Sequence, residues 1–557
     1  MPTLTWTGKE DALRAASLVP FRLLEPHRAA EGGIAREACV GDPEAAQDNL
    51  LIQGDNLEAL KALLPYYAGR VKCIYIDPPY NTGSAFEHYD DNLEHSTWLS
   101  MMYPRLELLR ELLSEDGSIW VNLDDGEAHY LKAIGDEIIG RSNFITNVIW
   151  EKSDSPRMDA EFFSSRHDHI LVWARNIKCC KLNRLDISEE KVPEHYGKVD
   201  SSGRQYYLKP LRAMGGQGET RESRPNLYYP LVAPDSKEVY PIRPNGTDGA
   251  WRWGREKVSE EGERIEWVLG RSGWVPYFRI YADQMRDRPP ETVWSFEQVG
   301  SNRTSKAEIK KLFPDSESFS TPKPEKLIRR IIEIATHPGD LVLDSFLGSG
   351  TTAAVAHKMG RRWIGIEMGK HAVTHCLPRL QKVIDGEQGG ISEAVGWKGG
   401  GGFRFVELGE TLFDAYGRLN PKVRFPDLAA FVWWRETKAP AIGDTIKSTS
   451  PFLGVHEGRG LYLLYNGILG DKRPAGGNAL TPAVLASLPK HDGPRVIYAE
   501  ATTYSPSSLA RMNIIFKQIP YDLGSMPLLA EGALEYAAGL APEASRTQSA
   551  DEEGDHV

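Results

Sequence analysis

"LVLDSFLGSGTTAAVAHKMGRRWIGIE", residues 341–367, has the pattern of a β-strand, a glycine-containing turn, an α-helix and a second β-strand. Gly348 and Gly350 lie where the strand meets the helix, so the backbone there can approach a ligand closely and offer free N–H groups. Glu367 ends the second strand, 17 residues after Gly350, where nucleoside-binding α/β units place a carboxylate that accepts from ribose hydroxyls. The spacing is not G-x-G-x-x-G, which disfavours dinucleotide binding. The alternative, a tight turn and a surface Glu, explains less of the whole pattern.

A second stretch, "CIYIDPPYNTG" at residues 73–83, ends an apolar strand in a carboxylate, two prolines and a tyrosine. Proline has a fixed φ and no backbone N–H, so such a segment is rigid and cannot extend a sheet. Taken alone, Asp-Pro-Pro at a strand end is equally well explained as a turn. Its meaning depends on the rest of the chain.

Strand and helix patterns alternate through most of the first 190 residues and return after residue 320, which predicts an α/β sheet. From about 190 to 320 short strands and Gly/Pro turns dominate, as in an inserted β-rich module. We expect an N-terminal segment 1–47, two halves of one domain at 48–195 and 321–405, an insertion at 196–320, a C-terminal domain at 406–540 and a disordered acidic tail at 541–557.

The chain has 557 residues and a net charge of −11, but the charge is unevenly distributed. Lys and Arg exceed Asp and Glu by 5 over residues 201–330, whereas residues 1–200 carry −13. The basic stretch is rich in aromatic residues, a combination that suits phosphate contacts and base stacking; an ordinary, slightly basic β-domain is an equally good explanation of charge alone. Five scattered cysteines and no long apolar run indicate a protein of the reducing cytoplasm without a signal peptide or membrane span.

Together the two motifs resemble those of the amino-group DNA methyltransferases. "DPPY" (77–80) is similar to the catalytic motif, "DSFLGSGTT" (344–352) to the S-adenosylmethionine motif, and "TPKPEKLI" (321–328) to the segment before it. The catalytic motif comes first in the chain, which is the β-class permutation of this family. Other stretches resemble the modification subunits of type III restriction systems: "GDNLEAL", "GSIWVNLDD" and "HDHILVWARN". The resemblance covers about residues 48–405.

The resemblance implies a Rossmann-like fold and methyl transfer from S-adenosylmethionine to the N6 amino group of an adenine flipped out of duplex DNA. Asp77 and the Pro78 carbonyl would accept from the amine N–H groups and free its lone pair, Pro79 would stiffen the turn, and Tyr80 would stack on the base. Transfer is direct, so neither a covalent intermediate nor a metal is needed.

The same resemblance implies a set of cofactor-binding residues: Lys323, Pro324, Asp344, Phe346, Gly348, Gly350, Thr351, Glu367 and Asp55. For Asp55 an Asx turn or helix cap is an equally good explanation. We expect Asp124 and Asp125 to cap a following helix, and His167 and Asp168 to serve the start of a strand.

Family architecture also makes the insertion at 196–320 the target-recognition domain. Three alternatives stay open: a cytosine-N4 methyltransferase, which more often begins its motif with Ser; a methyltransferase for protein or RNA amines, which often reads Asn-Pro-Pro-Tyr; and a DNA-binding specificity subunit without activity.

The C-terminal region carries one weak resemblance: "RMNIIFKQIPYDL" (511–523) is similar to segments of type III-like modification subunits. Such a region could dock a second copy of the chain, as in a homodimer, or a helicase-nuclease restriction subunit. It could equally be a structural extension of the catalytic domain. No G-x-x-x-x-G-K-[ST] motif occurs, so any DNA cleavage would need another protein.

Overall fold

The chain is described from a computed structural model, and its described part falls into two compact units. Unit 1 contains residues up to Asn183 together with those from Glu291 onward, and unit 2 is Arg184–Pro290. The described residues are 3–27, 39–81, 94–158, 160–185, 195–214, 218–270, 273–284, 288–314, 321–414, 416–441, 450–469 and 477–523.

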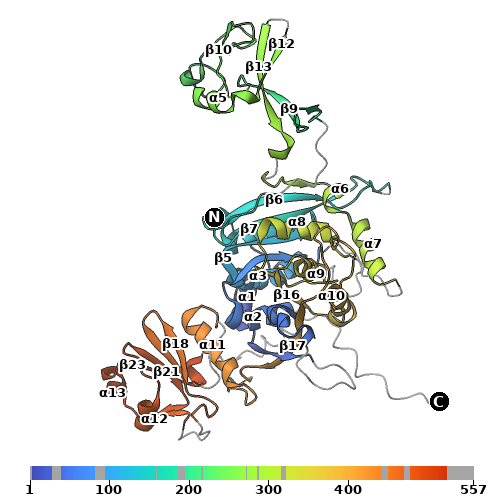
Figure 1. Cartoon of the computed structure of the whole chain (residues 1–557). Helices are drawn as coiled ribbons and strands as arrows, with labels where there is room; N and C mark the ends of the chain where they lie inside the picture. Colours follow the sequence, from blue (N-terminus) through green and yellow to red (C-terminus); the bar gives the residue numbers. More distant parts are fainter. Residues whose placement is uncertain are drawn as a thin grey trace, which may run out of the picture. The chain divides into compact units, whose positions relative to one another are not determined.

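A mixed, mostly parallel sheet of eleven strands among the described residues forms the centre of unit 1 (Figure 1). Its strand order is β1-β17-β3-β16-β15-β4-β5-β7-β6-β14, with β2 paired to β17. The strands are β1 (Arg22–Pro26), β2 (Cys39–Gly41), β3 (Leu50–Gln53), β4 (Val71–Ile76), β5 (Leu113–Leu123), β6 (Phe144–Glu151), β7 (His167–Ala174), β14 (Val293–Trp294), β15 (Leu341–Asp344), β16 (Arg362–Glu367) and β17 (Gly402–Thr411).

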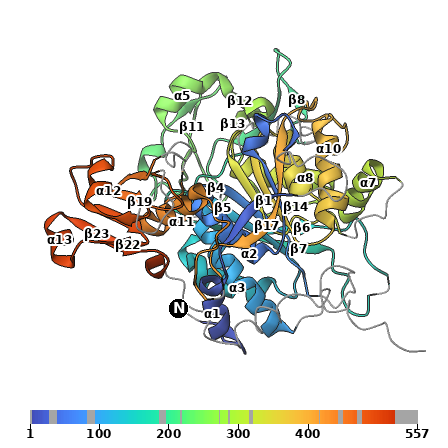
Figure 2. The same cartoon turned by 90° about the horizontal axis from the view of Figure 1, so that it is seen from below.

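Helices cover both faces of this sheet. The α-helices of unit 1, including those of its C-terminal part, are α1 (Lys9–Leu18), α2 (Asn56–Tyr67), α3 (His95–Leu112), α4 (Ala128–Gly135), α6 (Phe296–Val299), α7 (Asn302–Leu312), α8 (Glu325–Ala335), α9 (Thr351–Lys358), α10 (Leu377–Ile384), α11 (Phe425–Thr437), α12 (Pro482–Ser487) and α13 (Pro506–Arg511). Helices α1, α2 and α3 lie on one face, and α8, α9 and α10 lie on the other (Figures 1 and 2). This doubly covered sheet confirms the expected α/β, Rossmann-like class.

The apolar sequence of the central strands explains their position. Strand β4 reads VKCIYI and β15 reads LVLD, and almost every residue in them is buried, as parallel strands covered on both faces require. Helix α8 places Leu327, Ile328 and Ile331 in the core while its arginines lie on the other side. Local hydrophobic pattern therefore set which segments form the central layer.

The sheet changes winding direction between β15 and β4. Chain segments run from β3 through α2 to β4 and on through α3 to β5, whereas β15 continues through α9 to β16 in the opposite direction. Adjacent parallel strands with divergent connections form a topological switch point, where the loops after the strands separate and leave a crevice. Both sequence motifs follow these two strands.

Unit 2 has its own small core and its own sheets. Trp251, Trp253, Tyr229, Leu211 and Phe278 are buried together. The elements are β8 (Lys198–Val199), β9 (Gln205–Pro210), β10 (Leu231–Val232), β11 (Glu238–Val239), α5 (Arg255–Glu261), β12 (Ile265–Gly270) and β13 (Gly273–Tyr281). Strands β12-β13-β9-β8 form one antiparallel sheet and β10-β11 a ribbon.

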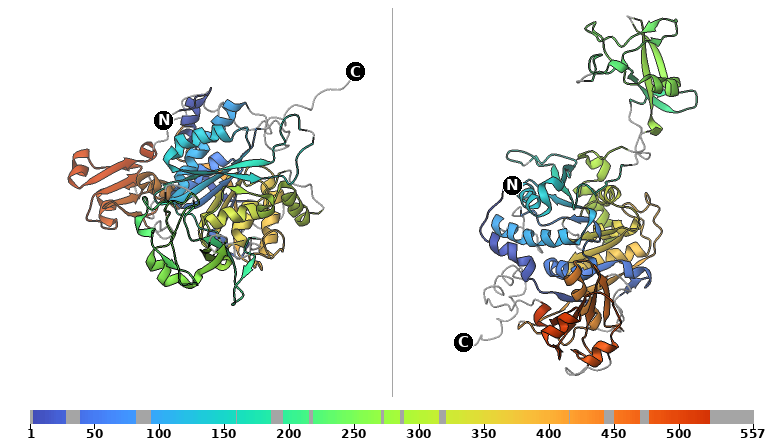
Figure 3. Two further views of the ribbon diagram at one scale, coloured as in Figure 1. Left: turned by 90° about the horizontal axis from the view of Figure 1, so that it is seen from above. Right: turned by 90° about the vertical axis from the view of Figure 1, so that its left-hand side faces the viewer.

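The C-terminal part of unit 1 contains a separate four-stranded sheet, coloured orange to red in Figure 3. Its strand order is β18-β19-β21-β23, and a short pair β20-β22 accompanies it. The strands are β18 (Phe452–His456), β19 (Arg459–Leu463), β20 (Ala479–Leu480), β21 (Arg495–Ala499), β22 (Ala501–Thr502) and β23 (Ile514–Gln518). Leu428 and Phe431 of α11 share one hydrophobic core with Leu60 and Leu63 of α2.

The structure departs from the expected divisions at several points. Residues 291–314 belong to unit 1, because β14 pairs with β6, so the separate unit is shorter than the expected insertion 196–320. Strand β17 crosses the expected boundary at residue 405 and lies wholly in the large sheet. The expected tail 541–557 lies outside the described residues.

None of the helices that the structure describes is both long and apolar enough to cross a membrane.

Candidate functional site

Five acidic residues stand at one edge of the central sheet, because parallel strands end on the same side. Asp55, Glu367, Asp344, Asp77 and Asp124 end or follow β3, β16, β15, β4 and β5 in that spatial order. Asp344 and Asp77 flank the switch point between β15 and β4. The two sequence motifs, more than 260 positions apart in the chain, thus meet at one crevice edge.

Asp77 forms an ion pair through Oδ2 with the Lys323 ammonium. The other carboxylate oxygen, Oδ1, is buried and makes no hydrogen bond of normal length with a described residue, although the Tyr80 hydroxyl is near enough to lower the pKa of this carboxyl. Burial raises the pKa of Asp77, and the charge of Lys323 opposes that rise. A buried acceptor without a donor is costly in a finished structure, so Oδ1 is ready to accept from an incoming N–H group.

The two prolines after Asp77 present their carbonyls differently. The Pro79 carbonyl accepts a hydrogen bond from Trp98 Nε1 at 2.8 Å, which anchors the turn to α3. No described residue donates to the Pro78 carbonyl. Asp77 Oδ1 and the Pro78 carbonyl are therefore two neighbouring acceptors at the end of β4.

Tyr80 is held by its hydroxyl. It donates to Asp168 Oδ2 at 3.1 Å and accepts from the Asn122 amide. Lys323 Nζ lies 5.1 Å from the centre of its ring. Burial and the Asp168 charge raise the pKa of Tyr80 well above its usual value, so the phenol stays neutral.

Asp168 belongs to the site, a role that was not predicted from the sequence. We expected it to serve the start of a strand, and it is the second residue of β7. Its buried carboxylate also joins Tyr80 to Lys152, whose Nζ lies 2.6 Å from Asp168 Oδ1. The signal was available in "HDHILVWARN", where a charged residue stands inside an apolar strand.

The glycine turn after β15 is closed by Glu367. The Gly348 N–H donates to Glu367 Oε2 at 2.7 Å. Gly348 has φ 57° and Gly350 has φ 82°, in the left-handed region that favours glycine. Gly350 precedes α9, so the turn leads directly to a helix N-terminus, and the Glu367 carboxylate is only 2 % exposed.

Asp344 shapes the same turn from inside. Its Oδ1 accepts from the Phe346 N–H at 2.9 Å and its Oδ2 from the Thr352 hydroxyl at 2.6 Å. Burial raises its pKa to about 7. Phe346 is itself buried. Both oxygens of Asp344 accept hydrogen bonds that hold the loop. Glu367 is engaged in the same way, because the Gly369 N–H donates to its Oε1 at 3.3 Å, and each carboxylate oxygen keeps a second lone pair.

Thr351 connects the turn to a buried charge network. Arg379 donates to the Thr351 hydroxyl at 2.8 Å and pairs with Glu325 at 2.8 Å. Glu325 also pairs with Lys358 at 2.8 Å, and Lys358 reaches Glu387 as well. These residues bind α8, α9 and α10 together behind the glycine turn. Nothing in the local sequence pattern distinguishes them from ordinary surface charges.

Asp55 caps α2: its Oδ1 accepts from the Leu57 and Glu58 N–H groups at 2.9 and 3.2 Å. This confirms the helix-cap alternative; the ligand contact stays a prediction. Its Oδ2 pairs with Arg105 at 3.1 Å. Pro324 occupies the N-cap position of α8, one residue after Lys323, so that helix start delivers Lys323 to Asp77.

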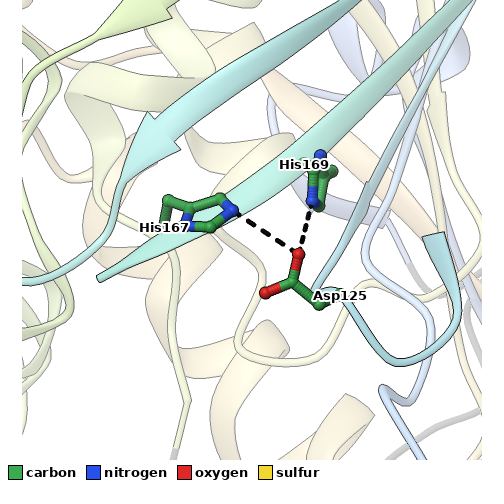
Figure 4. A group of neighbouring side chains, drawn as sticks. All are labelled: Asp125, His167 and His169. Carbon is green, nitrogen blue, oxygen red and sulfur yellow. Dashed lines mark hydrogen bonds and ion pairs between the residues drawn. The ribbon is translucent and has the colours of Figure 1, made fainter. Parts of the chain in front are cut away.

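The expected cap by Asp124 and Asp125 was wrong. The N-cap residue of α4 is Glu127, while Asp124 Oδ1 accepts from the Gly126 N–H in a turn. Asp125 turns instead toward His167 and His169 on β7 (Figure 4). One possible ligand atom from each of these three residues lies within 4.8 Å of the other two, so the residues are a candidate metal-binding group.

Comparison with known proteins finds relatives among restriction-modification Mod subunits and methyltransferases. The chain is 34% identical over 411 residues to the probable type III restriction-modification enzyme HindVI Mod subunit of Haemophilus influenzae, covering 65% of this chain and 54% of that protein. It is 33% identical to the EcoPI Mod subunit of Escherichia phage P1, covering 64% of this chain and 61% of that subunit. It is 31% identical to the type II methyltransferase M.KpnI of Klebsiella pneumoniae, covering 54% and 75%.

The chain therefore spans 54% and 61% of the length of the HindVI and EcoPI Mod subunits. A family model described as "DNA methylase" matches residues 71–377, from the start of β4 to the start of α10, and so contains both motifs and the crevice edge between them. By this match over more than half of its length, the chain belongs to the N6/N4 DNA methylase family.

Proposed function

We propose that the protein transfers a methyl group from S-adenosylmethionine to the N6 amino group of adenine in duplex DNA. The observation that carries this proposal is the pair of acceptors at the end of β4, Asp77 Oδ1 and the Pro78 carbonyl, beside the glycine turn. An exocyclic amine has two N–H groups, and two fixed neighbouring acceptors match them.

The described residues fit the cofactor. Glu367 is a buried carboxylate at the crevice edge, suited to hydroxyl groups of a ribose. The Gly348–Gly350 turn, in which Gly348 is half-buried, leads into the start of α9. When bound, S-adenosylmethionine supplies an electrophilic methyl group. Lys323, Pro324, Phe346 and Thr351 stay proposed neighbours of that ligand, and Asp344 and Asp55 act on it through the loops that they hold.

Asp77 and Pro78 would then activate the amine. By accepting both N–H groups they draw its lone pair out of conjugation with the ring and aim it at the methyl group. The amine loses one proton as it becomes a secondary amine, and Asp77 Oδ1 is placed to take it; the raised pKa of this carboxyl favours that role. Tyr80, fixed through its hydroxyl, offers its ring to the base.

Replacement of Asp168 by Asn is expected to lower kcat about 10- to 100-fold, because misplacement of Tyr80 by a fraction of an ångström disturbs the reacting geometry. The KM for cofactor should stay nearly unchanged, since Asp168 lies on the Tyr80 side of the site. Steady-state kinetics of this variant and of a control variant measures kcat and KM separately. Asp414→Asn, whose partner is the exposed Arg418, is the control; equal losses in the two variants would contradict the positioning role of Asp168.

The hairpin that joins β6 to β7 supports duplex DNA as the substrate. It leaves the sheet beside Asp168, where the Lys152 N–H donates to the Arg166 carbonyl at 2.9 Å. Phe162 and Phe163 on this hairpin are 85% and 94% exposed. Exposed aromatic rings on a hairpin whose base adjoins the site are suited to stack on bases or to fill the gap that a flipped base leaves.

Phe162→Ala/Phe163→Ala is expected to weaken DNA binding by about 1–3 kcal/mol per stacked base, with cofactor affinity unchanged. Fluorescence anisotropy with a labelled duplex measures the first quantity and calorimetry the second. Tyr521→Ala removes a comparably exposed aromatic ring, 76% exposed, from the C-terminal part and should bind DNA normally. If the double variant binds as the native chain does, the hairpin does not contact DNA.

The decisive experiment is transfer from labelled S-adenosylmethionine to unmethylated duplex DNA, with nucleoside analysis of the digested product. Label in N6-methyladenine supports the proposal. Label in N4-methylcytosine would support the same amine chemistry but show that the target base is cytosine. Label found only in RNA or protein would show that DNA is not the substrate.

We further propose that the protein works as a type III-like modification subunit. The similarity to the HindVI and EcoPI Mod subunits supports this, and unit 2 is our candidate for target recognition. A homodimer and a helicase-nuclease partner belong to the same proposal, with the C-terminal sheet as the candidate docking part. Light scattering of the purified chain tests the homodimer.

A further inference from the structure

Three side chains beside Asp168 converge on one point. His167 and His169 are two residues apart on β7, so they extend from the same face of the strand, while Asp168 between them extends from the other toward Tyr80. Asp125, in the loop after β5, reaches across to both imidazoles (Figure 4). The pair of strands that holds Tyr80 therefore carries a second cluster on its opposite side.

The spacing of the ligand atoms is close to that of a coordination shell. Asp125 Oδ1 lies 2.9 Å from His169 Nε2 and 3.5 Å from His167 Nε2. Ligands at about 2.0–2.1 Å from a tetrahedral metal ion lie roughly 3.3 Å from one another. Small side-chain rotations would thus bring the three atoms around one ion.

A second residue already supports one of these imidazoles. The Asn147 amide lies against His169 Nδ1, with its nitrogen at 2.9 Å and its oxygen at 3.3 Å. Rotation of this amide would present the oxygen to an Nδ1–H group, leaving Nε2 as the ligand atom. Ligand histidines usually have such a partner on their other nitrogen.

We propose that Asp125, His167 and His169 form a binding site for a divalent first-row transition metal, with Zn²⁺ as the ion to which this ligand set is best suited. Two imidazole nitrogens and one carboxylate oxygen match zinc, cobalt and nickel, whereas Mg²⁺ and Ca²⁺ prefer oxygen ligands. Three protein ligands leave a fourth position for water or for His129, whose ring centre is 5.7 Å from that of His169.

The metal would join the loop after β5 to the start of β7. Asn122, which contacts Tyr80, is the last residue but one of β5, just before this loop, and Asp168 stands between the two histidines. The ion would therefore restrain the two residues that orient Tyr80, without touching the reacting groups. This site goes beyond methyl transfer and does not depend on it.

The full-length chain, stripped of metal with a chelator and then dialysed, is titrated with Co²⁺. A tetrahedral nitrogen- and oxygen-ligated Co²⁺ ion gives visible absorption bands that saturate at one equivalent, and Zn²⁺ should displace it. Calorimetry with Zn²⁺ measures the affinity. No DNA or S-adenosylmethionine is present, so the outcome is independent of the proposed reaction.

Variants locate the site. His167→Ala and Asp125→Asn should abolish the cobalt bands, and Asn147→Ala should weaken zinc binding about 10- to 100-fold. His337→Ala, an exposed histidine on another loop, should bind metal as the native chain does. The proposal is overturned if the native chain shows no saturable binding, or if His167→Ala and Asp125→Asn both bind metal normally. Asp125 is exposed and its replacement conserves shape, so loss of folding is not expected to obscure that result.

Discussion

Asp77→Asn should lower kcat for methyl transfer by about 100- to 1,000-fold, the loss typical when one preorganised polar contact to the reacting group is removed. An Asn side chain could place its amide nitrogen where Oδ1 accepts, so one acceptor for the substrate amine would become a donor. It would also leave the Lys323 ammonium, only 10% exposed, without its carboxylate partner. Label transfer to duplex DNA at saturating cofactor measures the effect.

Asp116→Asn is a matched control for this prediction. Asp116 also pairs with a lysine, Lys72, at 2.7 Å, but it lies on the surface away from the motifs. Cofactor affinity should be retained in both variants, because Asp77 stands on the β4 side of the switch point and the glycine turn on the β15 side. Full activity of Asp77→Asn would contradict the proposal that Asp77 activates the amine.

Lys358→Met should lower the free energy of unfolding by about 3–5 kcal/mol, because it removes one partner from a buried charge network. The Lys358 side chain is 0% exposed and pairs with Glu325, which is 2% exposed, and with Glu387. Removing the cation leaves Glu325 with Arg379 as its cationic partner and Glu387 without its ion pair to Lys358 in the interior. Urea unfolding followed by circular dichroism at neutral pH measures the change.

Lys422→Met provides the comparison on the surface. Lys422 pairs with Glu410 at 2.6 Å, but both side chains are largely in solvent, where ion pairs contribute little. Its unfolding midpoint should not move. If Lys358→Met is as stable as the native chain, hydrophobic packing rather than the ion network holds α8, α9 and α10 together.

Local sequence determined most of the central sheet and the two loops at its edge. An apolar strand was predicted to end before Asp77, and β4 does end at Ile76, because a run of mainly apolar residues is followed by Asp77 and two prolines. The glycine turn followed from Gly348 and Gly350, whose positive φ values few other residues tolerate. Such features depend on the nearest neighbours in the chain, so they can be predicted without a structure.

Tertiary structure decided which side chains face each other across the crevice. Lys323 was expected on the cofactor side, yet it pairs with Asp77, 246 positions away. Asp168 reaches Tyr80, and Arg379 reaches Thr351, only because β4, β5 and β7 are neighbours and α10 lies beside α9. Strand order and helix packing arise from burial of the whole core, so a single stretch of sequence predicts the loops of this site but not their partners.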